Sequence, residues 1–508
     1  MSLTQPPCYP GMMTPMKPRL PILCLPALGQ LCSPGVILRV VSLLLFTQGS
    51  AFLHAQAIGP LRVHPTNPRY FTDGTANADG TLRAVYLTGS HTWANLVDMG
   101  KGDPPAPFDY EGYLDFLDRH HHNFFRLWRE EQVFFLDQRF IVTPHPWQRT
   151  GPGNAVDGKP KFDLTKFDDS YFARLRSRVQ AAGRRGIYVG VMLFEGWVLQ
   201  QKQNWWPDHP FHPDNNINGI NGDANGDGRG IEVHTMELPA VTKVQEAYVR
   251  RVIETVGDLD NVLWEISNEA GIYSTDWQYH FIRFIKAEES RRPKQHPVGM
   301  TFQYNPSTKL RGTNQILFDS PADWISPNSG INGNYSYKTN PPPADGRKVI
   351  IPDTDHLGGI WGTPEWVWKS FTRGLNPIFM DPYDNLIIGG ASPASWDALR
   401  SSLGHARLLA ERVNLAAMIP DEKVASTGYC LAERGASYVV FAPEGGEIEV
   451  DLSEAKSQLN VEWLEVASGK ITRATAVAGG AKRGLRAPFQ GPAVLILLPS
   501  LRKAGPGL

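Results

Sequence analysis

The sequence predicts an α/β protein whose main part is a (β/α)8 TIM barrel, followed by a small C-terminal antiparallel β-sandwich. Short apolar runs alternate with segments of helical spacing along the middle of the chain, and eight such runs can be counted. This alternation is typical of a parallel sheet closed into a barrel. After residue 420 the pattern changes to short strands separated by Gly- and Pro-rich segments. We therefore expect a leader at 1–57, a barrel at 58–420 and a β module at 421–508.

The predicted elements follow in order along the chain. The barrel strands are expected at 84–89, 122–128, 187–194, 262–267, 298–302, 324–326, 349–351 and 377–380. The helices are expected at 110–121, 168–185, 238–256, 277–291, 365–373 and 395–417. The module's strands are expected at 437–441, 448–452, 461–466 and 493–498. An open doubly wound sheet is the alternative, but no Gly-x-Gly-x-x-Gly turn follows the first strand, so the dinucleotide-binding signature is missing.

The N-terminal segment has the features of an export signal. Basic residues around Lys17 precede apolar stretches, of which the last is Val41–Phe46. Ala55 and Ala57 then form a small-residue cleavage pattern. We expect a protein exported to the periplasm or the extracellular space, with a disordered N-terminus as the alternative interpretation.

Charge and hydropathy exclude two classes of partner. The 50 Lys and Arg residues balance 51 Asp and Glu residues, so the chain lacks the positive charge with which proteins neutralise nucleic-acid phosphates. No apolar run of 18 or more residues follows the leader, so no membrane span is expected.

Polar and aromatic residues collect where the predicted strands end, and catalytic groups of a barrel lie at those ends. The candidates for catalysis and substrate binding are His91, Trp93, Arg126, Trp128, Glu195, Trp197, Asn268, Glu269, Asp353, Asp355, His356, Trp361 and Asp381. Carboxylates with aromatic residues suit sugar chemistry. One carboxylic acid can protonate the leaving oxygen, a second carboxylate can face the anomeric carbon, and aromatic faces can stack on the sugar. The expected partner is an oligo- or polysaccharide.

The segment NVLWEISNEA, Asn261–Ala270, resembles the fourth strand of clan A glycoside hydrolases. In that clan the Glu is the general acid/base and the preceding Asn binds the sugar 2-hydroxyl, so the resemblance implies these roles for Glu269 and Asn268. The clan's nucleophile, normally a Glu, ends strand seven, where this chain has VIIPDTDHLGG with Asp353 and Asp355. The shorter Asp leaves two outcomes open. Carboxyl groups about 5–5.5 Å apart predict retention of configuration, and about 6.5–9.5 Å predicts inversion.

A wider set of segments is similar to one group within this clan. YLTGSHTWANL, NFFRLWREE, DTDHLGG, WVWKSFTRG and NPIFMDPY resemble secreted bacterial proteins with an apiosidase-like barrel. SYVVFAPEGGEIEVDLS followed by VEWLEVASGK resembles the small β module, labelled collagen-binding, that often ends such chains. Studied members act on side chains of plant cell-wall pectin. The resemblance implies a glycosidase more firmly than a particular sugar, and Arg126 fits as the second-strand Arg that orients the nucleophile.

Together these features predict an exported glycoside hydrolase, with retention as the expected outcome. Glu269 would donate the proton, and Asp355 or Asp353 would attack or stabilise the anomeric centre. The main alternative is a non-catalytic carbohydrate- or matrix-binding protein on a degenerate barrel, because strand seven carries Asp instead of Glu. A polysaccharide lyase is a third interpretation, but the Lys/Arg-rich groove that acidic sugars require is not evident.

No cofactor is expected, and only one segment suggests a metal. Asp223, Asn225 and Asp227 in DANGDG reproduce the first half of an EF-hand loop. Position 12 would be His234 instead of the bidentate Glu that completes the calcium shell. A structural calcium is therefore the weaker interpretation, and a turn-rich loop is the alternative.

Overall fold

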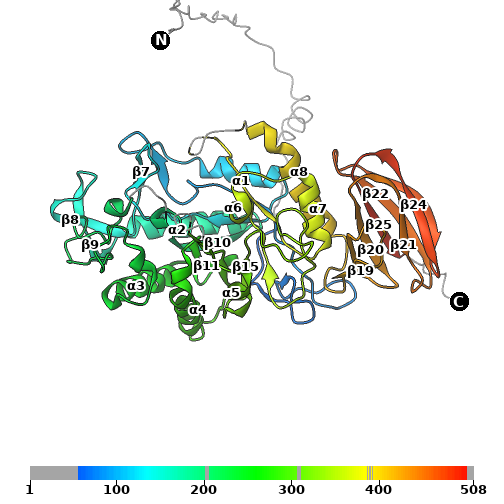
Figure 1. Cartoon of the computed structure of the whole chain (residues 1–508), viewed down its shortest axis with the longest axis horizontal. Coiled ribbons are helices and arrows are strands. Elements are labelled where there is room, and N and C mark those ends of the chain that lie inside the picture. The colour runs from blue at the N-terminus through cyan, green and yellow to red at the C-terminus, as the bar shows by residue number, and fades with distance from the viewer. Residues whose placement is uncertain are drawn as a thin grey trace, which may run out of the picture. The chain divides into compact units, whose positions relative to one another are not determined.

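The computed structural model describes residues 55–200, 205–305, 310–385, 387, 391 and 393–499, and the predicted leader before residue 55 lies outside this range. The main body is built on a six-stranded parallel sheet in the order β16-β15-β12-β11-β10-β5 (Figure 1). Its strands are β5 (Phe124–Leu127), β10 (Tyr188–Glu195), β11 (Val262–Asn268), β12 (Val298–Thr301), β15 (Trp324–Ser326) and β16 (Val349–Ile350). A parallel pair, β17 (Ile378–Met380) and β3 (Gly89–His91), accompanies this sheet.

The six-stranded sheet curls as a half-barrel, and backbone hydrogen bonds connect both of its edges to the parallel pair. On one side, the amides of Asn123 and Phe124 donate to the Thr88 carbonyl at 3.0 and 3.1 Å. On the other side, the amide of Ile378 donates to the Pro352 carbonyl at 3.0 Å. The predicted alternation of parallel strands and helices is thus confirmed.

Helices cover the outside of the sheet. The longer ones are α1 (Tyr110–Arg119), α2 (Asp169–Arg184), α3 (Pro239–Val256), α4 (Thr275–Glu289), α7 (Pro364–Thr372) and α8 (Asp397–Ala410). Asp109 and Asp168 cap α1 and α2 by accepting hydrogen bonds from the first-turn amides of Gly112 and Ser170. Every residue of β10 and β11 is buried, which explains why these strands read as nearly continuous apolar runs.

The first barrel strand differs from the expectation of 84–89. Residues 84–88 form no continuous strand, and Val85 makes only an isolated bridge to Phe71. The ladder with β17 begins at Gly89 and runs through Ser90 and His91. The sequence pattern placed this strand too early because two of its three ladder residues are polar and nevertheless buried.

Several short elements were not predicted. A three-stranded sheet consists of β4 (Asp98–Gly100), β7 (Phe140–Thr143) and β6 (Phe134–Phe135), and β8 (Trp147–Asn154) with β9 (Pro160–Phe167) forms a hairpin before α2. The other short elements are β1 (Arg62–Val63), β2 (Phe71–Thr72), β13 (Tyr304–Asn305), β14 (Leu310–Arg311), α5 (Asn314–Asp319) and α6 (Thr354–Gly358). The 3-10 turns are η2 (Val198–Gln200), η3 (Trp206–Asp208), η4 (Ile231–His234), η5 (Ile272–Ser274) and η6 (Pro393–Trp396).

The C-terminal region is an antiparallel β domain (Figure 1). Its larger sheet has the order β18-β19-β20-β25-β22-β23, and β21 pairs with β24. Their bounds are β18 (Ile419–Pro420), β19 (Cys430–Glu433), β20 (Ser437–Ala442), β21 (Gly445–Asp451), β22 (Gln458–Glu465), β23 (Ile471–Ala478), β24 (Lys482–Gln490) and β25 (Ala493–Pro499).

Both faces of the central strands β20 and β25 of the larger C-terminal sheet are buried. Val440 and Leu495 belong to the domain's own apolar core, whereas the alternate residues Val439 and Ile496 join the core that includes the barrel. This alternation follows from the two-residue period of a strand, and it packs the sheet onto the barrel side through α7 and β20.

The beginning of the described chain is part of the fold. Ala57, the last residue of the predicted leader, is buried, and its amide donates to the Gly183 carbonyl at 2.8 Å. The Tyr188 hydroxyl donates to the Ile58 carbonyl at 2.6 Å. None of the helices in the described part of the chain combines the length and apolarity needed to cross a bilayer.

Candidate active site

Arg126 on β5 is the centre of a buried network of charged groups. Its Nε and Nη2 donate to the two oxygens of Glu265 at 2.9 and 2.5 Å. Its Nη1 donates to Asp353 at 2.9 Å and to Asp355 at 3.0 Å, and Nη2 also donates to Oδ1 of Asn268 at 2.7 Å. Burial opposes the positive charge, but the surrounding carboxylates outweigh it and raise the pKa of Arg126 well above its usual value. The network therefore holds a permanently charged guanidinium group between β5, β11 and the segment that follows β16.

Asp353 is completely buried and its oxygens are occupied by the protein. Oδ1 accepts hydrogen bonds from the amide of Asp355 at 3.0 Å and from Nε2 of His91 at 2.9 Å. Trp128 donates its Nε1 hydrogen to Nδ1 of His91 at 2.8 Å, so the His91 proton lies on Nε2 and points to Asp353. Burial alone would raise the pKa of Asp353, but His91 and Arg126 together lower it. Asp353 is thus an ionised residue with structural partners.

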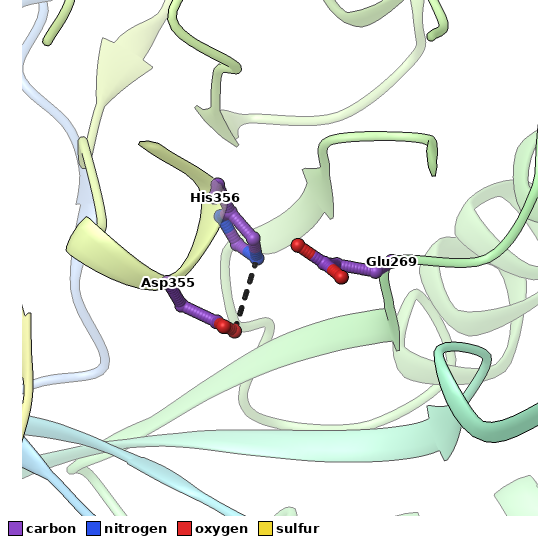
Figure 2. Close-up of side chains that lie close together, drawn as sticks. All are labelled: Glu269, Asp355 and His356. Carbon is purple, nitrogen blue, oxygen red and sulfur yellow. Dashed lines mark ion pairs between the residues drawn. The ribbon is translucent and has the colours of Figure 1, made fainter. Parts of the chain in front are cut away.

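Asp355 and Glu269 face a common space together with His356 (Figure 2). One side-chain ligand atom from each of the three residues lies within 4.8 Å of those of the other two. Asp355 lies in the first turn of α6, and Glu269 directly follows β11. The structure therefore brings together acids that are separated by 86 positions in the chain.

The backbone of Glu269 is strained. Its φ is +44°, in the left-handed region that costs a non-glycine residue on the order of 1–3 kcal/mol. The surroundings enforce this conformation, because Gln200 donates to the Glu269 carbonyl and the next residue, Ala270, packs against Gly196 so closely that a Cβ there would lie 2.4 Å from the Ala270 Cα. The turn directs the Glu269 carboxyl toward Asp355 instead of continuing the strand.

Burial and neighbouring charges raise the pKa of both acids. Burial, then the charges of Asp355 and Glu195, raise the pKa of Glu269 well above the usual carboxyl value. Burial and the charge of Asp353 raise the pKa of Asp355 to about 6, against the opposing effect of Arg126. Burial and its acidic neighbours thus favour the protonated form of Glu269, whereas the hydrogen bond from Arg126 favours the carboxylate of Asp355, an arrangement that suits an acid and a base within one site.

Asn268 is held at the same end of β11. Its Oδ1 also accepts from Nε2 of His356 at 3.3 Å, and its Nδ2 donates to Oε1 of Glu195 at 3.2 Å. The hydroxyl of Ser326 lies 2.7 Å from Nδ1 of His356. Burial, followed by the charge of Arg126, keeps the pKa of His356 well below its usual value, so this ring is neutral and donates through Nε2.

Two of the aromatic residues proposed as sugar platforms are buried. Trp93 and Trp128 are each 3% exposed, and their ring centroids are 6.2 Å apart. Trp128 also stacks on His91 at 5.7 Å, and the Arg126 guanidinium lies 5.0 Å from its ring. These two side chains support the charged network and offer little free surface to a sugar.

Two other candidate platforms keep exposed surface beside the acids. Trp197 follows Glu195 and lies 5.9 Å from Trp205, centroid to centroid. Trp361 donates its Nε1 hydrogen to the carbonyl of Thr354, next to Asp355, at 3.0 Å. Both rings remain candidates for stacking on a sugar.

Asp381 is not part of the charged network. It is fully buried and accepts from Nε and Nη2 of Arg400 at 2.8 and 2.5 Å and from the amide of Tyr383 at 2.8 Å. These bonds join the end of β17 to α8. The structure therefore gives Asp381 protein partners and no free face toward the acids.

The oxygens of the candidate calcium loop already serve as acceptors for the loop's own backbone. Asp223 accepts from the amides of Gly226, Asp227 and Gly228 at 3.1, 3.2 and 2.9 Å. Asn225 accepts from the amide of Asp227 at 2.7 Å. Such bonds are typical of a tight Asx-rich turn, and calcium at this loop stays a prediction.

Sequence reasoning missed two participants of the network. Glu265 lies inside β11, and its two oxygens accept from Nε and Nη2 of Arg126. Ser326, at the end of β15, contacts His356. A buried charge in an apolar strand was the available signal for Glu265, because such a charge requires a partner on a neighbouring strand.

Comparisons with known proteins support the fold. A family described as a domain of unknown function (DUF6298) matches residues 139–303. A search of curated protein sequences gave no match. A solved family 5 glycoside hydrolase from Bacteroides vulgatus ATCC 8482 is 15% identical with a TM-score of 0.57, and the alignment covers 88% of this chain and 96% of that one.

A further solved structure, described as a glycoside hydrolase, is 14% identical with a TM-score of 0.53, covering 88% of this chain and 99% of that one. At such low identity these similarities establish a shared fold. The chain thus shares the fold of these solved glycoside hydrolases, whereas its place among apiosidase-like proteins and the collagen-binding label stay predictions.

Proposed function

We propose that this protein is an exported, retaining glycoside hydrolase in which Glu269 is the general acid/base and Asp355 is the nucleophile. The observation that carries the proposal is the approach of Glu269 and Asp355 to within 4.8 Å across a common space. One oxygen of each carboxyl group thus lies within 4.8 Å of the other, which supports the separation of about 5–5.5 Å of retaining enzymes over the roughly 6.5–9.5 Å that leaves room for an attacking water. The similarity to solved glycoside hydrolases supports the same conclusion.

The geometry favours Asp355 over Asp353 as the nucleophile. Asp353 has no exposed surface, and His91, Arg126 and the Asp355 amide occupy its oxygens. The Asp355 side chain is 9% exposed, and the hydrogen bond from Arg126 orients it. A sugar can therefore reach Asp355 without breaking the network that holds Asp353.

The reaction follows from these positions. The Asp355 carboxylate attacks the anomeric carbon while the bond to the leaving oxygen breaks and Glu269 gives that oxygen its proton. The product is a glycosyl ester on Asp355 and a free alcohol. Water then attacks the anomeric carbon, Glu269 takes the water proton, and the Asp355 carboxylate is released. Two inversions restore the original configuration.

The proposal includes three further features. We infer that the eight parallel strands form a closed (β/α)8 barrel, and the backbone bonds beside β3 and β17 on both sides of the half-barrel support this closure. The protein is exported, as the N-terminal pattern predicts. Its substrate is a side chain of a plant cell-wall polysaccharide, and the resemblance to the apiosidase-like group supports this class.

The test is a screen of pectic and hemicellulosic oligosaccharides with product analysis by mass spectrometry. Wild-type protein should release a sugar, and Glu269→Gln should lower turnover by about 10²–10⁴, the usual value of a positioned proton donor. Glu254→Gln, at an exposed helical carboxylate, is the matched control and should leave turnover unchanged. Wild-type turnover in Glu269→Gln on an unactivated substrate would contradict the assignment.

A further inference from the structure

Glu195 and Asn268 lie side by side at the ends of two paired strands. β10 and β11 are parallel, and Glu195 is the register partner of Asn268 in their ladder. Neighbouring residues in register extend their side chains to the same face of a sheet. The hydrogen bond from Nδ2 of Asn268 to Oε1 of Glu195 at 3.2 Å is therefore built into the strand pairing.

Backbone amides of the protein donate hydrogen bonds to both oxygens of the Glu195 carboxyl group. Oε1 also accepts from the amide of Trp197 at 2.9 Å, and Oε2 accepts from the amide of Val198 at 3.0 Å. Glu195 is 1% exposed, and its own amide donates to Glu131. At 1% exposure the carboxyl group presents almost no surface to a sugar, and turning it toward one would leave buried N–H groups unpaired at a cost of about 1–3 kcal/mol each. A direct contact with substrate, as the sequence suggested, is thus unfavourable.

The Asn268 amide has a defined orientation. Arg126 can only donate, and neutral His356 donates through Nε2, so both point to the amide oxygen. Glu195 accepts one of the two Nδ2 hydrogens, and no described residue accepts the other. Asn268 directly precedes Glu269 and contacts His356, which lies with Glu269 and Asp355, so its amide is close to the space between the two acids.

We propose that Glu195 is a positioning residue that fixes the Asn268 amide so that its remaining N–H donates to the sugar hydroxyl next to the anomeric carbon. This inference rests on the proposed function. Bonds to this hydroxyl strengthen in the transition state of glycoside hydrolysis, so correct orientation of the amide raises turnover more than ground-state binding. The bonds from Trp197 and Val198 fix Glu195 in turn, which couples the loop after β10 to the catalytic strand.

The test compares Glu195→Met and Glu195→Gln on two substrates with the same leaving group, one with and one without the hydroxyl at carbon 2. Met has a similar length and no oxygen acceptor. Glu195→Met should lower kcat about 10- to 100-fold on the hydroxylated substrate, which corresponds to one buried hydrogen bond. On the 2-deoxy substrate the loss should be below about threefold, because there is no hydroxyl for Asn268 to bind.

Glu195→Gln is the conservative rescue. Gln can keep an oxygen toward both Asn268 and Trp197 and lose only the bond from Val198, so its kcat should be within about threefold of wild type. The matched control is Glu289→Gln, a buried carboxylate bonded to Trp264 and His296 away from the site, which should affect both substrates equally. Equal losses on both substrates for Glu195→Met, or a Gln variant as slow as the Met variant, would overturn the proposal.

A second measurement is independent of turnover and of the folding of the Met variant. In a crystal structure of Glu195→Gln, the introduced side chain should remain within hydrogen-bond distance of Nδ2 of Asn268 and move away from the Val198 amide. The inference would be overturned if the introduced side chain kept its contacts with Trp197 and Val198 but no longer lay within hydrogen-bond distance of the Asn268 amide. If wild type hydrolyses no glycoside, the proposed function fails, and this structure still decides whether Glu195 positions Asn268.

Discussion

Asp353 and Asp355 are two residues apart, yet their replacement by Asn should have opposite consequences. The structure gives Asp353 three protein partners and no exposed surface, whereas Asp355 faces Glu269. We therefore expect Asp353→Asn to reduce mainly the free energy of unfolding and Asp355→Asn to reduce mainly turnover.

The magnitudes follow from the bonds that each substitution weakens. Asp353→Asn removes the charge from the bonds with His91 and Arg126, each worth about 1.5–3 kcal/mol, so the free energy of unfolding should fall by about 3 kcal/mol or more. Asp355→Asn weakens one bond with Arg126 of about 1.5–3 kcal/mol and also removes the repulsion with Asp353. These effects oppose each other, and the net change should be below about 1.5 kcal/mol.

Activity should show the reverse order. Loss of the Asp355 nucleophile should lower kcat by on the order of 10³ or more, as for other nucleophile deletions. Asp353→Asn keeps the nucleophile and should retain more activity than Asp355→Asn per folded molecule. An added small nucleophile such as azide should restore turnover of an activated substrate to Asp355→Gly and not to Asp353→Gly.

The assay combines urea unfolding, followed by the fluorescence of the 14 tryptophans, with initial rates on an activated aryl glycoside. The reasoning would be refuted if Asp353→Asn were as stable as wild type and inactive while Asp355→Asn kept its turnover.

Two further predictions concern proton affinities. The kcat/KM should fall as the pH drops below about 6, because the Asp355 pKa is raised to about 6 and the protonated carboxyl cannot attack; a rate that stays constant from about pH 7 to pH 4 would contradict this. Glu130 is 2% exposed, neither of its oxygens has a hydrogen-bond partner among the described residues, and burial with the charges of Glu195 and Glu131 raises its pKa. The protonated carboxyl therefore contributes fully to the free energy of unfolding below the unfolded carboxyl pKa of about 4.3, and this contribution is lost as the pH rises. Because Gln does not titrate, Glu130→Gln should lose less free energy of unfolding than wild type between about pH 5 and pH 8 in urea titrations. Equal losses in the two proteins would exclude this role.

The sequence predicts the strands and helices that bury continuous or periodic apolar faces. β10 and β11 consist almost entirely of such residues, and helices α2 and α3 were expected within one or two residues of their observed bounds. The strand observed as β3 was predicted too early in the chain because its ladder residues Ser90 and His91 are polar. Their burial depends on tertiary partners that a local sequence pattern does not reveal.

The sequence identified most residues of the site but did not predict how they are arranged. Asp353 and Asp355 are two positions apart, so in a continuous strand they would point to the same face. In the structure, however, α6 begins at Thr354, with Asp353 as its N-cap and Asp355 in its first turn. The two-residue period of a strand therefore does not apply, and the distinct roles of the two carboxylates emerge only from their partners. Trp128 shows the same limit, because burial beneath Arg126 and not residue type decides what it contacts.

The central claim is that Asp355 forms a bond with the sugar opposite Glu269. A 2-deoxy-2-fluoro glycoside with a reactive leaving group slows hydrolysis of the glycosyl ester, so the ester accumulates on the protein. The labelled protein can then be digested, and the modified residue located by fragment mass spectrometry. The account predicts the added sugar mass on Asp355 in wild type. An adduct on Asp353, or release of a first product with inverted configuration and no adduct, would contradict it.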